Sequence, residues 1–136
     1  MSTENQDIRW KQRFANFEKA MLLMERTLQI EELSEAEMGG LIQFYEMAFE
    51  LAWKLMKDYL AEDGFIVKSP REAIKQAFQS ELIVDGQVWL DAMRDRNLTA
   101  HTYNESIALQ VIADISDEYY PALNQFYIDM KARISA

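Results

Sequence analysis

Residues 34–64 read SEAEMGGLIQFYEMAFELAWKLMKDYLAEDG, and apolar side chains recur through this stretch at intervals of three and four positions. Such a period is typical of an α-helix. Ser34 and Glu37 have the S-x-x-E spacing of a capping box, and Gly64 suits the C′ position that closes a helix. The apolar positions cover most of the circumference of this helix. We therefore expect it at the centre of a helical bundle, or in a dimer interface as well.

Helical periodicity continues on both sides of this stretch, whereas the alternating pattern of β-strands is nearly absent. Four further helices are expected, at residues 8–29, 69–78, 85–96 and 104–133. Pro121 lies inside the last of these and lacks a backbone donor, so a bend is expected about one turn upstream, near Asp117. The sequence predicts an all-α fold: an antiparallel up-and-down four-helix bundle with one short extra helix, forming a single domain over residues 1–136.

The composition is typical of a globular protein, with 49% hydrophobic residues, 27% charged residues and no cysteine. The lack of cysteine excludes a disulfide scaffold and thiolate zinc sites, and it suits a cytoplasmic location. No apolar run approaches the roughly 20 residues of a membrane span, and the N-terminus does not resemble a signal peptide. No contact with a membrane is therefore expected.

The net charge of −9 argues against broad, non-specific binding to nucleic acid. A contact with RNA would need a local cluster of positive charge. Lys68, Arg71 and Lys75 form one such cluster around the start of the short helix. Two interpretations of it remain open: a solvated charged face, or a contact to RNA or another phosphate.

The chemically distinctive stretch is RDRNLTAHTY, residues 94–103, between the last two long helices. His101 is the only histidine of the chain, and Arg96 precedes it by five positions on a helical face shared with Trp89 and Ala92. A histidine near its neutral pKa can exchange a proton with a ribose hydroxyl, and an arginine can stabilise charge on a phosphoryl group. The pair suits metal-free cleavage of a phosphodiester. A two-fold dimer would supply the second histidine that acid and base catalysis together require.

Signatures of other catalytic and metal-binding classes are missing. The sequence contains no P-loop, no GxGxxG, no G-x-S-x-G and no H-E-x-x-H. Glu46 and Glu50 lie four positions apart on one helix, as in half of a di-iron site, but the Glu-x-x-His pairs that such a site needs are absent. We therefore expect neither a metal ion nor a cofactor.

Two segments resemble a known family. R-N-L-T-A-H-T-Y (residues 96–103) resembles the R-x4-H-x-Y motif of HEPN domains, and F-E-L-A-W-K (residues 49–54) resembles the second-helix signature of one HEPN branch. That branch is the nucleotidyltransferase substrate-binding proteins, which include the HepT-type toxins. S-P-R-E-A-I-K-Q-A-F and D-G-Q-V-W-L-D are similar to the same branch, so the resemblance extends over nearly the whole chain.

The resemblance implies a homodimer of four-helix bundles and a minimal nucleotidyltransferase (MNT) as partner protein. It also implies that Arg96, Asn97 and His101 are the catalytic residues of a ribonuclease. Tyr103 would carry the hydroxyl that the MNT adenylylates to silence the toxin. Arg94 fits the looser R-x6-H spacing, so both arginines remain candidates for one role.

Three hypotheses about function follow. In the first, the chain is the HEPN toxin of a two-gene HEPN/MNT toxin–antitoxin system and cleaves RNA without a metal ion. In the alternative, it is a non-catalytic substrate-binding subunit of a two-component nucleotidyltransferase. In the third, it is a structural bundle whose histidine is merely packed. Cleavage of RNA that depends on His101 would separate the first from the others, and co-purification with an MNT would separate the second from the third.

Overall fold

The computed structural model of the chain describes the backbone of residues 3–98 and 104–135, and the side chains of residues 9–97 and 104–135. All regular structure in these residues is helical. The elements are α1 (Thr3–Leu28), α2 (Glu35–Glu62), α3 (Pro70–Gln79), α4 (Gly86–Leu98), α5 (Glu105–Asp114), the π-helical turn η2 (Ile115–Tyr119) and α6 (Tyr120–Ser135). The predicted all-α fold with one short extra helix, α3, is thereby confirmed. None of the described helices combines the length and apolar character needed to cross a membrane.

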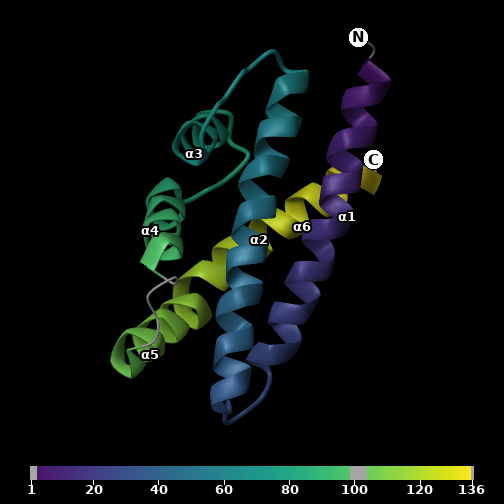
Figure 1. Cartoon of the computed structure of the whole chain (residues 1–136). Coiled ribbons are helices and arrows are strands. Elements are labelled where there is room, and N and C mark those ends of the chain that lie inside the picture. Colours follow the sequence, from purple (N-terminus) through teal and green to yellow (C-terminus); the bar gives the residue numbers. More distant parts are fainter. Residues whose placement is uncertain (1–2, 99–103, 136) are drawn as a thin grey trace.

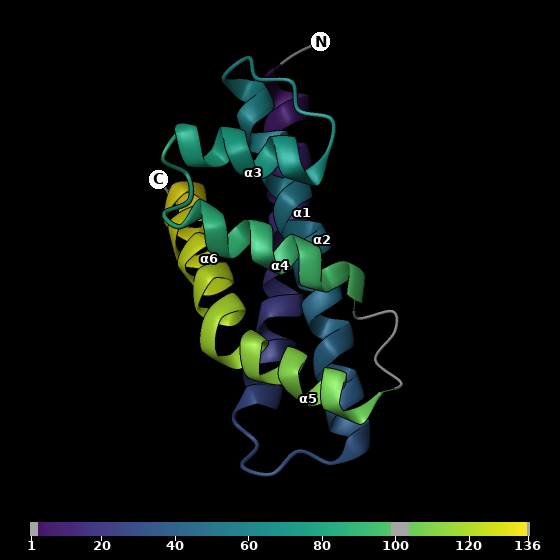
Figure 2. The same cartoon turned by 90° about the vertical axis from the view of Figure 1, so that its left-hand side faces the viewer.

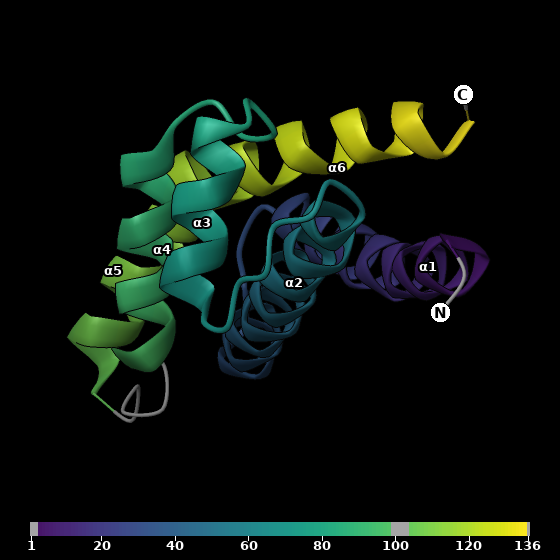
Figure 3. The ribbon, with the colours of Figure 1, turned by 90° about the horizontal axis from the view of Figure 1, so that it is seen from above.

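Helix α2 is the central element of the bundle, as its apolar circumference predicts. It runs beside α1, and α6 crosses behind the two (Figure 1). Seen from above, α2 lies between α1 on one side and α3 and α4 on the other (Figure 3). Its buried side chains cover more than half of its circumference, since at about 100° per residue the buried Asp58 and Leu60 differ in direction by about 200°. The core therefore forms around α2, and the other helices pack on it.

Both ends of α2 are closed as predicted. The Ser34 hydroxyl accepts a hydrogen bond from the Glu37 N–H at 3.1 Å, and the Glu37 carboxylate accepts one from the Ser34 N–H at 2.8 Å. At the other end Gly64 has a φ of 87°, in the left-handed region. The N–H groups of Gly64 and Phe65 donate to carbonyls of the last turn at 3.1 Å each, which is the Schellman arrangement.

We expect Gly64→Ala to lower the free energy of unfolding by about 1–2 kcal/mol, because an L side chain is strained at this φ. Gly39→Ala is the matched control of opposite sign. Gly39 lies inside α2, and beyond the backbone of that helix no atom lies within 4 Å of the place a Cβ would occupy. Alanine there should therefore raise stability by about 0.5–1 kcal/mol. Urea unfolding monitored by circular dichroism measures both changes. If Gly64→Ala leaves the free energy of unfolding unchanged, the left-handed glycine that closes α2 contributes nothing to stability.

The last helix is interrupted by η2, and the spacing of its buried residues explains the interruption. Those residues follow one another at intervals of four: Val111, Ile115, Tyr119 and Leu123. At about 100° per residue, twelve residues of regular α-helix would turn the last position about 120° away from the first. A π turn accommodates one additional residue and removes most of that drift. All four side chains can therefore face the same core.

Pro121 accounts for the position of this π turn. In a regular α-helix the N–H of residue 121 would donate to the carbonyl of Asp117, but proline has no N–H. In the π turn the Tyr120 N–H instead donates to the carbonyl of Ile115, five residues earlier. The axis changes direction between α5 and α6 (Figure 2). The bend predicted near Asp117 is thus found there, in the form of a π turn.

Candidate active site at the end of α4

The stretch 94–103 lies where α4 ends and α5 begins. Helix α4 starts after Asp85, whose carboxylate accepts the Val88 N–H at 3.2 Å, and ends at Leu98. Helix α5 starts after Asn104, whose side-chain oxygen accepts the Ser106 N–H at 3.0 Å. The C-terminal end of α4 and the N-terminal end of α5 lie on the same side of the molecule (Figure 2).

Two of the predicted site residues, His101 and Tyr103, lie outside the described residues, so the structure leaves their predicted roles untested. Arg96 and Asn97 are described and belong to the last turns of α4. The described part of the site is therefore the arginine side of the motif.

The guanidinium of Arg96 is held against α2. One of its terminal nitrogens donates to Glu50 Oε2 at 3.1 Å, and the other donates to Asn97 Oδ1 at 3.0 Å. Its Cζ lies 5.2 Å from the centroid of the Phe49 ring, a cation–π distance. The side chain is 21% exposed, as expected for a residue that shares a helical face with the buried Trp89 and Ala92. A charged group in such a position keeps a defined direction and remains within reach of solvent.

Arg94 has a different environment on the same helix. Its side chain is 65% exposed, and its guanidinium pairs with Asp95 at 3.1 Å and Asp91 at 3.6 Å. The hydrogen bond with Asp95 raises the pKa of the Arg94 guanidinium. Because residues two apart on a helix differ in direction by about 200°, Arg94 faces outward while Arg96 faces α2. The two candidate arginines are thus distinguished by their surroundings.

Glu50 was not expected as a partner of Arg96, because the two residues are 46 positions apart in the sequence. Sequence spacing alone suggested only that Glu50 shares a helix face with Glu46. Its second oxygen, Oε1, accepts from Lys54 at 3.3 Å. Glu50 therefore lies between two cations, one of them from the candidate motif. Among the described residues, no three His, Cys, Asp or Glu side chains are grouped as metal ligands would be.

Sequence reasoning also missed a buried polar network beneath the end of α4. The Tyr45 hydroxyl donates to the Ala92 carbonyl at 2.5 Å, and the Tyr119 hydroxyl donates to the Asp95 carboxylate. The two tyrosine rings stack at 5.6 Å between centroids with 19° between planes. Desolvation raises the pKa of both hydroxyls, and the hydrogen bond to Asp95 adds to this effect at Tyr119. Both hydroxyls therefore stay protonated and act as donors.

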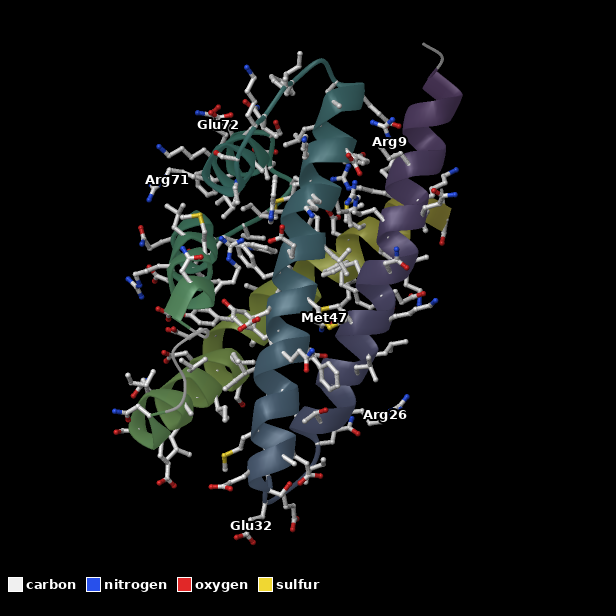
Figure 4. All side chains as sticks on the ribbon, in the orientation of Figure 1. Arg9, Arg26, Glu32, Met47, Arg71 and Glu72 are labelled. Carbon is white, nitrogen blue, oxygen red and sulfur yellow. The ribbon has the colours of Figure 1, made fainter. Side chains whose placement is uncertain are left out.

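The positive cluster belongs to α3 and the residue two positions before it, whereas the network joins α2, α4 and η2. Lys68, Arg71 and Lys75 are all exposed. Arg71 extends from the side of α3 that faces away from α2 (Figure 4). Both interpretations of the cluster, a solvated face and a phosphate contact, remain compatible with this exposure.

Residues 12–132 match the sequence model of the family described as nucleotidyltransferase substrate binding protein like. Over 85 residues the chain is 35% identical to the probable ribonuclease HepT of Haemophilus influenzae. That match covers 58% of this chain and 58% of the relative, so it spans little more than half of the curated protein.

Two solved structures share the fold. A crystal structure from Thermus thermophilus matches with a TM-score of 0.74 and 30% sequence identity, covering 88% of this chain and 99% of that one. A tri-AMPylated HEPN toxin of Shewanella oneidensis, solved in complex with an MNT antitoxin, matches with a TM-score of 0.72. At 15% identity, over 97% of this chain and 99% of the toxin, the second similarity concerns the fold alone.

Proposed function

The chain belongs to the nucleotidyltransferase substrate binding protein like family, and we propose that it is the toxin of a HEPN/MNT toxin–antitoxin system. Its activity would be metal-independent endonucleolytic cleavage of RNA. The observation that carries this proposal is the orientation of the Arg96 guanidinium, which Glu50 holds in place. Arg96 lies five positions before His101, the only histidine of the chain. The name of the Haemophilus influenzae relative, a probable ribonuclease, supports the same activity.

The proposed reaction needs only protein side chains. His101 takes the proton of a ribose 2′-hydroxyl, and the 2′-oxygen attacks the adjacent phosphorus. The bond from phosphorus to the 5′-oxygen breaks, which leaves a 2′,3′-cyclic phosphate and a 5′-hydroxyl. The leaving oxygen takes its proton from the second histidine of a homodimer. Arg96 stabilises the charge that grows on the phosphoryl oxygens, and Asn97 keeps its guanidinium in place.

Regulation by a partner completes the proposal. An MNT would transfer AMP from ATP to the Tyr103 hydroxyl and release pyrophosphate, and the added group would block the active site. The solved HEPN toxin that shares this fold is tri-AMPylated and bound to an MNT antitoxin, which supports this proposal.

The test is a cleavage assay on unmodified protein. The purified chain is first checked by intact mass for adenylyl groups and then incubated with total RNA in excess EDTA. We expect cleavage products that end in cyclic phosphate. Intact RNA after incubation with unmodified protein would reject the toxin proposal.

The second candidate function is a non-catalytic substrate-binding subunit of a nucleotidyltransferase. The description of the family favours it, and so does the net charge of −9, which disfavours RNA. It predicts a stable complex with the MNT, and it predicts that neither the unmodified chain nor the adenylylated chain cleaves RNA. Size-exclusion chromatography of the co-expressed pair, followed by the RNA assay, separates it from the toxin proposal.

The environments of the two arginines lead to a prediction about the motif. Arg96→Ala is expected to lower kcat/KM for RNA about 10²-fold, because an oriented cation next to the phosphate is lost. Arg94→Ala should lower kcat/KM by no more than about threefold. The Arg94 side chain is exposed and paired with Asp91 and Asp95, and exposed ion pairs contribute little to stability. Steady-state cleavage of a fluorogenic RNA measures both. If Arg94→Ala has the larger effect, the working spacing is R-x6-H and Arg96 is structural.

A further inference from the structure

Asp95 is a buried carboxylate between the two candidate arginines. Asp58 and Asp95 are the two charged side chains buried among the described residues, with 9% and 7% of their surface exposed. Burial of a carboxylate is unfavourable unless partners compensate for the lost water. Asp58 is accounted for by Arg13, which joins α1 to α2 at 2.9 Å. Asp95 has two partners: its Oδ1 accepts from the exposed Arg94 Nε at 3.1 Å, and its Oδ2 accepts from the Tyr119 hydroxyl, on η2.

Tyr119 and Tyr45 together form a platform under the last turns of α4. Their stacked rings come from η2 and α2, and each hydroxyl donates to α4. The two acceptors, the Ala92 carbonyl and the Asp95 carboxylate, lie three residues apart, on one side of the helix. Arg96 follows Ala92 by four residues, so it projects from nearly the same side. The platform therefore fixes two things about the turn that carries Arg96: its distance from the stacked rings and its rotation about the axis of α4.

The π turn is what brings Tyr119 to this position. Counted along a regular α-helix from Val111, Tyr119 would already have turned about 80° away from the core-facing direction. The extra residue in η2 reduces this difference, and Tyr119 is 2% exposed and bonded to Asp95. A π turn of this kind is a local departure from regular helix that often accompanies a functional site.

We propose that Asp95 is a positioning residue for Arg96, and that the hydrogen bond from Tyr119 to Asp95 fixes the rotation of the last turn of α4. This rotation keeps the Arg96 guanidinium over Phe49 and against Glu50, pointed to where the phosphate would bind. The catalytic part of this inference rests on the proposed ribonuclease function. The geometric part, that Asp95 and Tyr119 determine where Arg96 points, does not.

Three variants and one control test the proposal in the full-length chain. Tyr119→Phe keeps the stacked ring and removes only the hydroxyl. Asp95→Ala removes the acceptor, and Asp95→Asn restores an acceptor oxygen without the charge. Asp58→Ala is the matched control, because it removes the other buried carboxylate at a site joined to α1. Three kinds of quantity are measured: the melting temperature, kcat and KM for RNA, and the ¹⁵N–¹H resonance of Arg96 Nε, in a guanidinium whose Cζ lies 5.2 Å from the centroid of the Phe49 ring.

We expect Asp58→Ala to lower the melting temperature and to leave both kcat per folded molecule and the Arg96 resonance unchanged. Tyr119→Phe and Asp95→Ala should lower kcat about tenfold with KM nearly constant, because a misdirected guanidinium weakens the transition state rather than RNA binding. Both should also move the Arg96 resonance. Asp95→Asn should recover most of kcat and return the resonance toward its wild-type position.

The outcomes separate the two proposals. If Tyr119→Phe and Asp95→Ala behave like Asp58→Ala, with a lower melting temperature but unchanged kcat and Arg96 resonance, Asp95 is structural and the inference is overturned. If Asp95→Ala fails to fold, Tyr119→Phe decides, since it removes a single oxygen atom. If the unmodified wild type cleaves no RNA, the proposed function fails, and the Arg96 resonance alone decides whether Asp95 positions the guanidinium.

Discussion

His101→Ala is expected to lower the rate of RNA cleavage by about 10²–10⁴-fold, the range that a positioned general acid or base contributes. His101 is the only histidine in 136 residues, so no other imidazole of the same chain can replace it. In a homodimer the substitution removes both the base and the acid, which places the expected loss toward the upper end of this range. The measurement is kcat for a fluorogenic RNA, with wild type and variant at equal concentrations of folded protein.

Two controls show whether the lost activity reflects the missing imidazole rather than a change in folding. Circular dichroism should show the same helical content and a similar melting temperature for the variant and the wild type. Mixed dimers with one His101→Ala subunit should lose most of their activity if one histidine acts as acid and the other as base. A variant that cleaves RNA at the wild-type rate would remove the proposed mechanism, because no other group in the motif accepts a proton near neutral pH.

The fold was predictable because its signals are local. A capping box needs two side chains three positions apart, and a Schellman closure needs one glycine, so Ser34, Glu37 and Gly64 mark the ends of α2 in the sequence itself. The start of α1 was placed too late, at residue 8 instead of Thr3. The reason is that residues 3–7 are polar, and periodicity reveals only the part of a helix that faces a core.

The candidate site was predictable only in part, because its contacts join distant segments. The pairing of Glu50 with Arg96 spans 46 positions, and no spacing rule relates them. Asp95 appeared in the sequence as an ordinary charged residue beside Arg94. Its burial depends on Tyr119, whose position depends on the π turn. The four-residue intervals from Val111 to Leu123 do contain the signal for that turn, since three successive intervals of four do not fit a regular α-helix.

Tyr103→Phe is expected to abolish silencing by the MNT partner while leaving ribonuclease activity intact. Phenylalanine keeps the ring and lacks only the oxygen that would accept AMP. Cells that express the wild-type toxin with an active MNT should grow, and the recovered toxin should be heavier by whole adenylyl groups. Cells that express Tyr103→Phe with the same MNT should stop growing, as they would without it, and the toxin should have its unmodified mass.

The other tyrosines provide the control for this experiment, because the chain contains six and the structure describes the surroundings of five. Tyr45 and Tyr119 are buried and donate hydrogen bonds to α4. The hydroxyls of two others are bonded across the bundle, Tyr127 to Glu18 at 2.6 Å and Tyr59 to Arg133 at 2.8 Å. Tyr120 is therefore the matched control: Tyr120→Phe should remain silenced and modified. If Tyr103→Phe is also silenced and modified, the MNT uses another acceptor. If a Tyr103→Phe, His101→Ala double variant still arrests growth, the arrest is not caused by RNA cleavage.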